Sequence, residues 1–237
     1  MGHFCSIAID GPSGAGKSTI ARRCAEFFGI LYVDTGAIYR TVGLAALRAG
    51  IDRKDSVAIS ELLPGLNIDI RYSEAGEQLM LLNGENVSSA IRQPEISICA
   101  SDVSALPEVR SFLMDMQRHL ASTHHVIMDG RDIGTVVLPG ADLKIYLTAS
   151  AEARAGRRLN ELLEKGIQTD FETVLADIHY RDMQDSSRAT APLRQAEDAI
   201  LVDSTDLSFD ETFAVISQLI IEHLCIGEGL NAGQDNT

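Results

Sequence analysis

The sequence predicts an α/β protein whose central parallel sheet is flanked by helices, and three observations indicate this fold. Short apolar runs, partly β-branched, alternate with longer segments of helical periodicity, as in strand–helix–strand units. A glycine-rich loop lies between the first such run and the first helical segment. One stretch, residues 67–87, alternates between apolar and polar residues, which predicts a small antiparallel insert.

The glycine-rich loop, Gly11–Ser18, matches the pattern G-x-x-x-x-G-K-[ST]. Its glycines allow backbone N–H groups to point into one hollow that fits a polyphosphate, and the dipole of the following helix favours the negative charge. In such a P-loop Lys17 bridges the β- and γ-phosphates and the Ser18 hydroxyl binds Mg²⁺. An accidental glycine-rich turn is the alternative. The apolar strand over Phe4–Ile9 and the apolar residues at helical spacing after the loop favour the P-loop NTPase fold.

Length, charge and cysteine usage exclude several classes of protein. A chain of 237 residues suits one P-loop core with one or two small attachments, and no apolar run approaches the ~18 residues that cross a bilayer. The net charge of −14 does not suit sequence-independent binding of nucleic acid. The four cysteines show no metal-ligand spacing, and Cys5 and Cys24 lie in apolar patterns that predict buried thiols. The N-terminus lacks the pattern of a signal peptide. We therefore expect a cytoplasmic protein.

Local patterns predict the elements that follow the P-loop helix, which Gly29 ends. Residues 31–33 predict a second strand, and a helix to about Ala49 follows with Asp34 or Thr35 as its cap. Within the insert, Asn83-Gly84 is a strong hairpin signal. The insert is either decoration or a wall for a second substrate, and we favour the wall because long insertions in α/β folds often carry function.

Two prolines and a buried strand mark the next segment. Pro94 and Pro107 each predict the start of a helix. The strand over His125–Asp129 ends in a carboxylate, which is either a Walker-B aspartate that organises the Mg²⁺ shell or part of an Asp-Gly turn. The loop Gly130–Thr135 follows at the carboxyl end of that strand, where open α/β sheets bind ligands, so its Arg-Asp pair is a functional candidate.

Two helices carry a further group of arginines. After a strand over 143–147, Ser150 predicts the start of a helix whose three arginines share one face, and Asp170 starts a second helix with charged residues at spacings of four and three. We interpret these helices, over about 151–190, as a lid that closes over phosphates, with exposed salt-bridged helices as the alternative. The chain ends with a strand over 199–202, a helix opened by the capping box of Ser208 and Glu211, and a tail over 226–237 that we expect to be disordered.

A P-loop, a strand-end carboxylate and an arginine-bearing lid suit phosphoryl transfer, which needs positioning and charge neutralisation more than a general base. No candidate base stands out, as expected if the acceptor is a phosphate whose oxygen is already anionic. The number of arginines also indicates a second phosphate. The rival interpretations are a P-loop kinase of a hydroxylated metabolite, a non-catalytic nucleotide-binding module, and a GTPase switch, which would need an Asn-Lys-x-Asp motif that this chain lacks.

The sequence resembles the bacterial-type cytidylate kinases of the nucleoside monophosphate kinase family from Ile7 to about Leu224. The stretches that carry the resemblance are residues 9–17, 34–40, 129–137 and 181–193. The resemblance implies ATP-dependent phosphorylation of CMP and dCMP, with Mg²⁺, by a monomer. It also implies a core over residues 1–62 and 104–225 that includes the lid, and an inserted β subdomain over 63–103 that binds the nucleoside monophosphate.

The same resemblance implies roles for individual residues. ATP binding is expected from Gly11, Pro12, Ser13, Gly14, Ala15, Gly16, Lys17, Ser18, Thr19, Arg154 and Arg157. The expected CMP contacts are Thr35, Arg40, Arg131, Arg181 and Arg188 near the phosphate, Ser101, Arg110 and Asp132 at the cytosine edge, and Asp185 at the ribose. The expected catalytic residues are Lys17, Arg131, Arg158, Arg181 and Arg188, and the expected metal-site residues are Ser18 and, indirectly, Asp129.

Asp132 carries the expected base specificity. Its carboxylate would accept from the exocyclic N4 amine of cytosine, where uracil presents an oxygen. Uracil would therefore leave buried polar groups unpaired, at a cost of about 1–3 kcal/mol each. Arg110 would donate to N3 and O2 of the base. Many nucleoside monophosphate kinases have glycine directly after the P-loop lysine, whereas Ser18 and Thr19 follow it here, so the hydroxyl that faces Mg²⁺ stays open.

Overall fold

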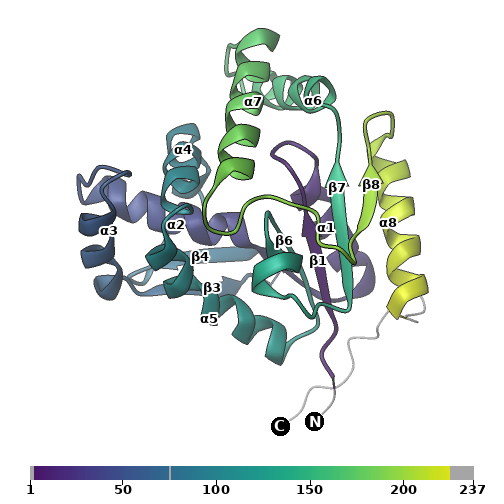
Figure 1. Ribbon diagram of the computed structural model, residues 1–237, viewed down its shortest axis with the longest axis horizontal. Helices are drawn as coiled ribbons and strands as arrows, with labels where there is room; N and C mark the ends of the chain where they lie inside the picture. Colours follow the sequence, from purple (N-terminus) through teal and green to yellow (C-terminus); the bar gives the residue numbers. More distant parts are fainter. Residues whose placement is uncertain (1–2, 75, 225–237) are drawn as a thin grey trace. The chain divides into compact units, whose positions relative to one another are not determined.

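The computed structural model describes residues 3–74 and 76–224 of the chain (Figure 1). The described residues form two compact units. The first unit comprises residues 3–32, 121–187 and 191–224. The second unit comprises residues 33–120, apart from 75, and residues 188–190. The predicted boundaries of the inserted subdomain, 63 and 103, remain a prediction, and the predicted disordered tail lies outside the described residues.

The central sheet confirms the predicted α/β fold. Its five strands lie in the order β2-β6-β1-β7-β8, and their bounds are β1 (Ser6–Asp10), β2 (Leu31–Asp34), β6 (Val126–Gly130), β7 (Leu143–Thr148) and β8 (Ile200–Asp203). Strand β1 pairs in parallel with β6 and β7, and β7 with β8. The register places Asp10 opposite Gly130 and Tyr146, so the loops that leave β1 and β6 start from the same edge of the sheet. Parallel sheets of this kind bind ligands at that edge.

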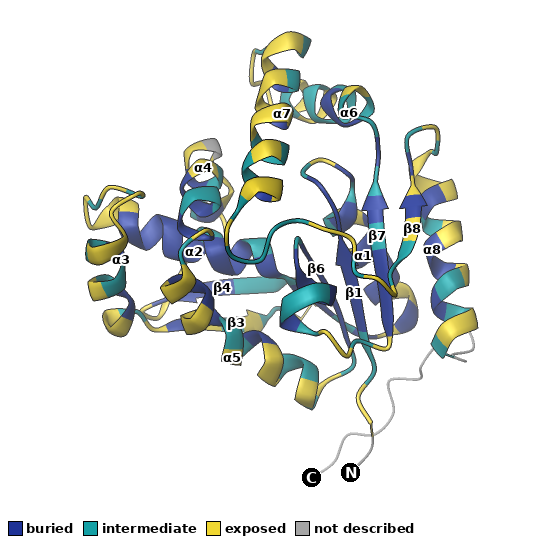
Figure 2. Ribbon diagram, in the orientation of Figure 1, coloured by how far each residue is buried: buried dark blue, intermediate teal, exposed yellow. Residues whose placement is uncertain are grey.

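Two helices of the first unit pack with this sheet in one apolar core. They are α1 (Lys17–Phe28) and α8 (Phe209–Leu224), and their apolar side chains join those of β1, β6, β7 and β8. Figure 2 shows strands β1, β6 and β7 mostly buried, whereas β8 and the outer face of α8 carry exposed residues. Gly29 ends α1 in the left-handed conformation, as predicted. The capping box of α8 is also confirmed, because Ser208 and Glu211 each accept from the backbone N–H of the other. Cys24 is buried as predicted, whereas Cys5 is only half-buried.

The two arginine-bearing helices form a hairpin in the first unit. They are α6 (Ala151–Glu164) and α7 (Phe171–Ser187), and Ala155, Val174 and Ile178 form a small apolar cluster between them. The predicted caps are present, because Ser150 Oγ accepts from the N–H of Ala153 at 3.1 Å and Asp170 Oδ1 accepts from that of Thr173 at 2.8 Å. This cluster is separate from the core around the sheet, so the hairpin is an attachment with its own packing.

The second unit contains the predicted antiparallel insert. Its strands are β3 (Ile68–Tyr72), β4 (Gln78–Leu82) and β5 (Glu85–Asn86), and its helices are α2 (Thr35–Arg48), α3 (Ser56–Leu62), α4 (Pro94–Val103) and α5 (Pro107–Thr123), of which α5 ends beyond the unit. Asn83 and Gly84 both have positive φ, 52° and 85°, as a tight hairpin turn requires. Both proline-initiated helices are confirmed, and α3 is an additional helix that the periodicity did not predict.

The insert is tied to the start of α2 by one side chain. Gln78 of β4 accepts from the backbone N–H of Asp34 at 2.7 Å, and its amide donates to the carbonyl of Asp34 at 3.2 Å. Such support is needed because the third strand, β5, has only two residues, and a sheet that is little more than a two-stranded hairpin is marginally stable alone. Among the described residues, no helix is both long and apolar enough to cross a membrane.

Candidate active site

The P-loop of the first unit has the backbone that the motif predicts. Gly11, Gly14 and Gly16 have φ values of +150°, +77° and +86°, which residues with side chains rarely adopt. Gly16 stands at the N-cap of α1, and no side chain of the described residues caps the first turn. The backbone N–H groups at this helix start are therefore left for an anionic ligand.

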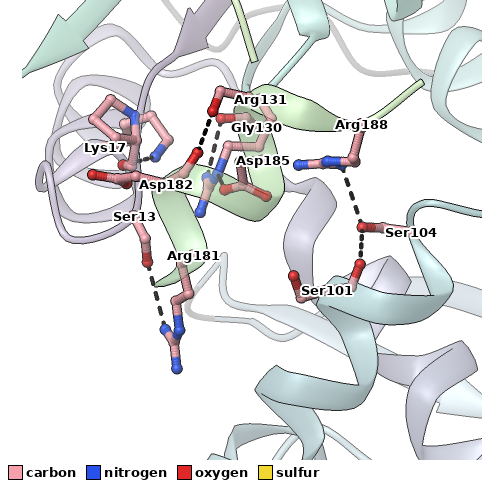
Figure 3. Close-up of polar contacts among 12 residues, drawn as sticks. Ser13, Lys17, Ser101, Ser104, Gly130, Arg131, Arg181, Asp182, Asp185 and Arg188 are labelled. Carbon is pink, nitrogen blue, oxygen red and sulfur yellow. Dashed lines mark hydrogen bonds and ion pairs between the residues drawn. The ribbon is translucent and has the colours of Figure 1, made fainter. Parts of the chain in front are cut away.

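Lys17 folds back onto the loop that precedes it. Its Nζ donates to the carbonyl of Pro12 at 2.8 Å, and the side chain is buried (Figure 3). Burial and then the positive charge of Arg131 lower the pKa of the Lys17 ammonium. A phosphate next to Lys17 would offset both effects, so the lysine is suited to binding an anion.

Ser18 rather than Thr19 meets the strand-end carboxylate. Ser18 Oγ donates to Asp129 Oδ2 at 2.8 Å, and the Tyr32 hydroxyl donates to Oδ1 of the same carboxylate at 2.8 Å. Asp129 is buried, while Thr19 is exposed. This arrangement favours Ser18 as the hydroxyl that faces a metal, and it matches a Walker-B carboxylate better than a simple Asp-Gly turn.

Asp10 fixes the loop that leaves the neighbouring strand. Its carboxylate accepts from the backbone N–H groups of Ile133 at 2.8 Å and Gly134 at 2.7 Å, at the start of a short π-helical turn over Ile133–Val137. Burial raises the pKa of the Asp10 carboxyl to about 6, although both N–H groups oppose the rise. The functional candidates Arg131 and Asp132 directly precede this anchored turn, so Asp10 holds their backbone in place.

Arg131 and Asp185, both predicted CMP contacts, form an ion pair in the first unit. Arg131 Nε donates to Asp185 Oδ2 at 2.6 Å, and its Nη1 donates to the carbonyl of Gly130 at 3.2 Å (Figure 3). Asp185 is buried. Burial lowers the pKa of the Arg131 guanidinium, but the carboxylates of Asp185, Asp129 and Asp10 together more than offset that effect, so the net shift is upward. Asp132 is buried at the N-terminus of the π-helical turn.

The three arginines of α6 have different partners, so the prediction that they act from one face is not matched by their contacts. Arg154 is buried and forms a bidentate ion pair with Asp182 of α7 at 3.0 and 2.7 Å. It also donates to the carbonyl of Ser13 at 2.9 Å. Arg157 donates to the Ser204 hydroxyl at 3.2 Å, and Arg158 pairs with Glu161 at 2.7 Å. Salt bridges therefore link the two helices and Arg154 contacts the P-loop, while closure of these helices over phosphates remains a prediction.

Arg181 of α7 also reaches the P-loop. Its Nη1 lies 3.5 Å from the Ser13 hydroxyl (Figure 3). Burial and the positive charge of Arg158 lower the pKa of the Arg181 guanidinium, and Arg131 contributes in the same direction. The first unit therefore gathers cations that repel one another. An anion bound between them would relieve this repulsion.

In the second unit, Arg40 lies against the first turn of its own helix. Arg40 Nη2 pairs with Asp34 Oδ2 at 2.7 Å, while Asp34 Oδ1 caps α2 by accepting from Ala37 N at 2.8 Å. A Cβ on Gly36 would lie 3.0 Å from Arg40 Nη1, so glycine leaves room for this guanidinium. Among the described residues Arg40 Nε is buried without a hydrogen-bond partner. Arg40 thus has a donor to spare for an oxygen ligand. Thr35, the first residue of the same helix, is also buried.

The other predicted CMP residues of the second unit meet at the C-terminus of α4. Arg110 is buried although it lies off the apolar stripe of its helix, because its guanidinium stacks 5.6 Å from the centre of the Tyr39 ring. Arg110 also donates to the Ser104 carbonyl at 3.3 Å, and Arg188 donates to the Ser104 hydroxyl at 3.3 Å. Ser101, half-buried, completes this group through its backbone carbonyl, which accepts from Ser104 Oγ at 2.9 Å.

Sequence reasoning missed three residues that support the site. Asp10, Asp182 and Ser104 hold the predicted residues in place but were given no role, although Asp10 and Asp182 lie in stretches that carry the family resemblance. A signal existed for Asp10, because it ends an apolar strand as Asp129 does. No such signal links Asp182 to Arg154 or Ser104 to Arg188, since these partners lie 28 and 84 positions apart along the chain.

A parallel sheet, a P-loop and a Ser–Asp pair behind it define a protein of the P-loop NTPase fold. Comparison with known proteins identifies the family. The family model described as cytidylate kinase matches residues 7–222. The cytidylate kinase of Caldicellulosiruptor saccharolyticus is 51% identical over 214 residues, which is 90% of this chain and 94% of that protein. The cytidylate kinase of Pasteurella multocida is 46% identical over 226 residues, which is 95% of this chain and 99% of that protein. The chain belongs to the cytidylate kinase family.

A solved shikimate kinase from Bacteroides thetaiotaomicron aligns over 93% of this chain and 98% of its own, with a TM-score of 0.45 and 12% identity. That similarity is too distant to support a functional argument.

Proposed function

We infer that this protein is an ATP-dependent kinase that transfers the γ-phosphoryl group of ATP to CMP and releases ADP and CDP. Identity of 46–51% with cytidylate kinases over at least nine-tenths of the chain carries this conclusion. The cations Lys17, Arg131 and Arg181 support it, because burial and like charges lower the pKa of Lys17 and Arg181. We also propose that dCMP accepts the phosphoryl group of ATP.

The residues are suited to a reaction without a general base. A phosphate oxygen of CMP attacks the γ-phosphorus, the bond to the bridging oxygen breaks, and the electron pair leaves on the β-phosphate of ADP. Charge builds up on the equatorial and leaving oxygens, and fixed cations stabilise it. We propose that Lys17, Arg131, Arg158, Arg181 and Arg188 supply these cations.

The donor site, in this proposal, is the P-loop. Backbone N–H groups within residues 11–19, where Pro12 has none to offer, cradle the phosphates. Arg157 remains a predicted ATP contact. Arg154 holds the Ser13 carbonyl and Asp182 at once, so it would also set the position of the loop relative to α6 and α7. Both interactions lie within the first unit.

We propose that Mg²⁺ binds beside Ser18 with Asp129 behind it. The fit rests on the donor set: a hydroxyl already oriented by a buried carboxylate suits this hard cation. When bound, the ion would neutralise negative charge on the phosphates of ATP. The protein's own contribution is to orient the Ser18 hydroxyl through Asp129 and Tyr32.

Ser18→Ala should raise the Mg²⁺ concentration for half-maximal turnover by roughly 10–100-fold, the scale seen when the support of a metal site is lost. Thr19→Ala is the matched control and should change it little, because Thr19 is exposed. Titrating Mg²⁺ at fixed ATP and CMP measures both. A larger effect of Thr19→Ala would assign the metal to the other hydroxyl.

For the acceptor, we propose that Thr35, Arg40, Arg131, Arg181 and Arg188 hold the CMP phosphate, that Ser101, Arg110 and Asp132 read the base, and that Asp185 binds the ribose. Two observations support this proposal: Arg40 Nε is a buried donor without a partner among the described residues, and Asp132 is a buried carboxylate. Cytosine offers its N4 amine to such an acceptor, whereas uracil does not.

Asp132→Asn tests the base assignment without changing side-chain size. The amide can donate to the uracil O4 oxygen, so the ratio of kcat/KM for CMP over UMP should fall by about 10–100-fold, corresponding to roughly 1–3 kcal/mol. Asp115→Asn, at an exposed position on α5, is the control. An unchanged ratio would remove Asp132 from base recognition.

The remaining expectations are proposals of the same kind. We propose a monomer in the cytoplasm that does not bind nucleic acid. The net charge of −14 supports the last point, since a sequence-independent contact with phosphate backbones needs a basic surface.

A further inference from the structure

Ser104 is the point at which three predicted CMP residues of the second unit meet. It follows α4 as its C-cap and is 7% exposed. Its hydroxyl donates to the Ser101 carbonyl at 2.9 Å and accepts from Arg188 Nη1 at 3.3 Å. Its own carbonyl accepts from Arg110 Nη1 at 3.3 Å. Figure 3 shows the Ser104 side chain between Arg188 and Ser101.

The direction of these bonds explains why a hydroxyl suits this position. A serine hydroxyl has one hydrogen and two lone pairs. The hydrogen is directed at the Ser101 carbonyl, so the lone pairs remain for the guanidinium of Arg188. An alanine methyl group would offer neither bond, and a thiol accepts only weakly.

We propose that Ser104 is a positioning residue for the acceptor nucleotide, acting through Arg188 by its hydroxyl and through Arg110 by its carbonyl. The proposal rests on the proposed function, in which Arg188 holds the CMP phosphate and Arg110 reads the base. Ser104 itself need not touch CMP. Because the two arginines use different atoms of Ser104, a side-chain substitution separates their roles.

Ser104→Ala removes only the hydroxyl contacts and leaves the carbonyl for Arg110. We expect the KM for CMP to rise about 3- to 10-fold, the range for loss of one hydrogen bond, with the KM for ATP unchanged. The KM for UMP should rise by the same factor, so the CMP-to-UMP ratio stays constant. Ser104→Cys should behave like alanine at nearly the native volume. Ser104→Thr, which retains a hydroxyl, should restore part of the loss.

A double-mutant cycle with Arg188→Ala tests the route of the effect. If Ser104 acts through Arg188, then Ser104→Ala should add less than a factor of about 1.5 to the KM for CMP in the Arg188→Ala background. Ser89→Ala, an exposed serine of the same unit, is the control. Binding of CMP measured by the shift in melting temperature gives a readout independent of turnover.

The outcomes separate this inference from the proposed function. If the unmodified protein releases no ADP with CMP, the proposed function fails. If it does, but Ser104→Ala and Ser104→Cys both leave the KM for CMP unchanged, the positioning role is overturned. Additive effects with Arg188→Ala, or an equal rise in the KM for ATP, would also overturn it.

Discussion

Lys17→Ala is expected to lower kcat by about 10²–10³-fold, the loss that follows removal of one fixed group that stabilises transition-state charge. The protein should stay folded, with its free energy of unfolding changed by no more than about 1 kcal/mol, because burial of this ammonium already opposes its charged form. Within the described residues, Lys17 Nζ donates a hydrogen bond to a loop carbonyl, so the substitution leaves one acceptor to be satisfied by water. Steady-state turnover of CMP and denaturant unfolding measure the two effects separately.

The control for Lys17 is Lys54→Ala, at an exposed position of the second unit. It should retain both turnover and stability. Turnover of Lys17→Ala within about tenfold of the unmodified protein would contradict the assignment of the P-loop as the phosphate site, since that site depends on this charge.

Gly11→Ala is expected to damage the fold itself, with a loss of about 4 kcal/mol or more in the free energy of unfolding. A Cβ at Gly11 would lie 1.9 Å from the backbone carbonyl oxygen of Leu147 and 3.0 Å from its carbon. Leu147 belongs to β7, which pairs with β1 directly before the loop, so neither backbone can move without breaking the sheet. The φ of +150° at Gly11 adds strain for any side chain. Denaturant unfolding followed by circular dichroism measures the loss.

Gly50→Ala is the control for steric overlap. Gly50 also has positive φ, +68°, but among the described residues a Cβ there would meet no atom within 4 Å. The Gly50→Ala variant should lose only about 1 kcal/mol of its free energy of unfolding, because a side chain is strained in the left-handed conformation. Equal stability of the two variants would show that the contact between Gly11 and Leu147 can relax.

The strands and most helices could be predicted because their signals are local. Apolar runs marked the strands, and caps such as Ser150, Asp170 and the Ser208–Glu211 box marked helix starts. Helix α3 was missed because it has only seven residues, although Asp55 caps it by accepting from Ala58 at 3.0 Å. A segment that short gives too few turns for a helical period to stand out.

The site could be predicted only where a motif fixes the chemistry. The P-loop pattern supplied Lys17 and Ser18, and the end of a buried strand supplied Asp129. The spacing of the α6 arginines predicted a common face. An arginine side chain is long enough, however, to bond with residues that lie far from it in the sequence. Arg154 turns to Asp182 and Ser13, which sequence spacing cannot show. Arg110 is buried despite its position off the apolar stripe because Tyr39 covers it, a contact made only in the folded chain.

The decisive measurement for the proposed activity is acceptor-dependent release of ADP, with CMP, dCMP, UMP, AMP and GMP offered in turn. We expect rapid release with CMP and dCMP, slower release with UMP, and negligible release with AMP and GMP. A preference for AMP, or ADP release that does not depend on an acceptor, would contradict the proposed activity.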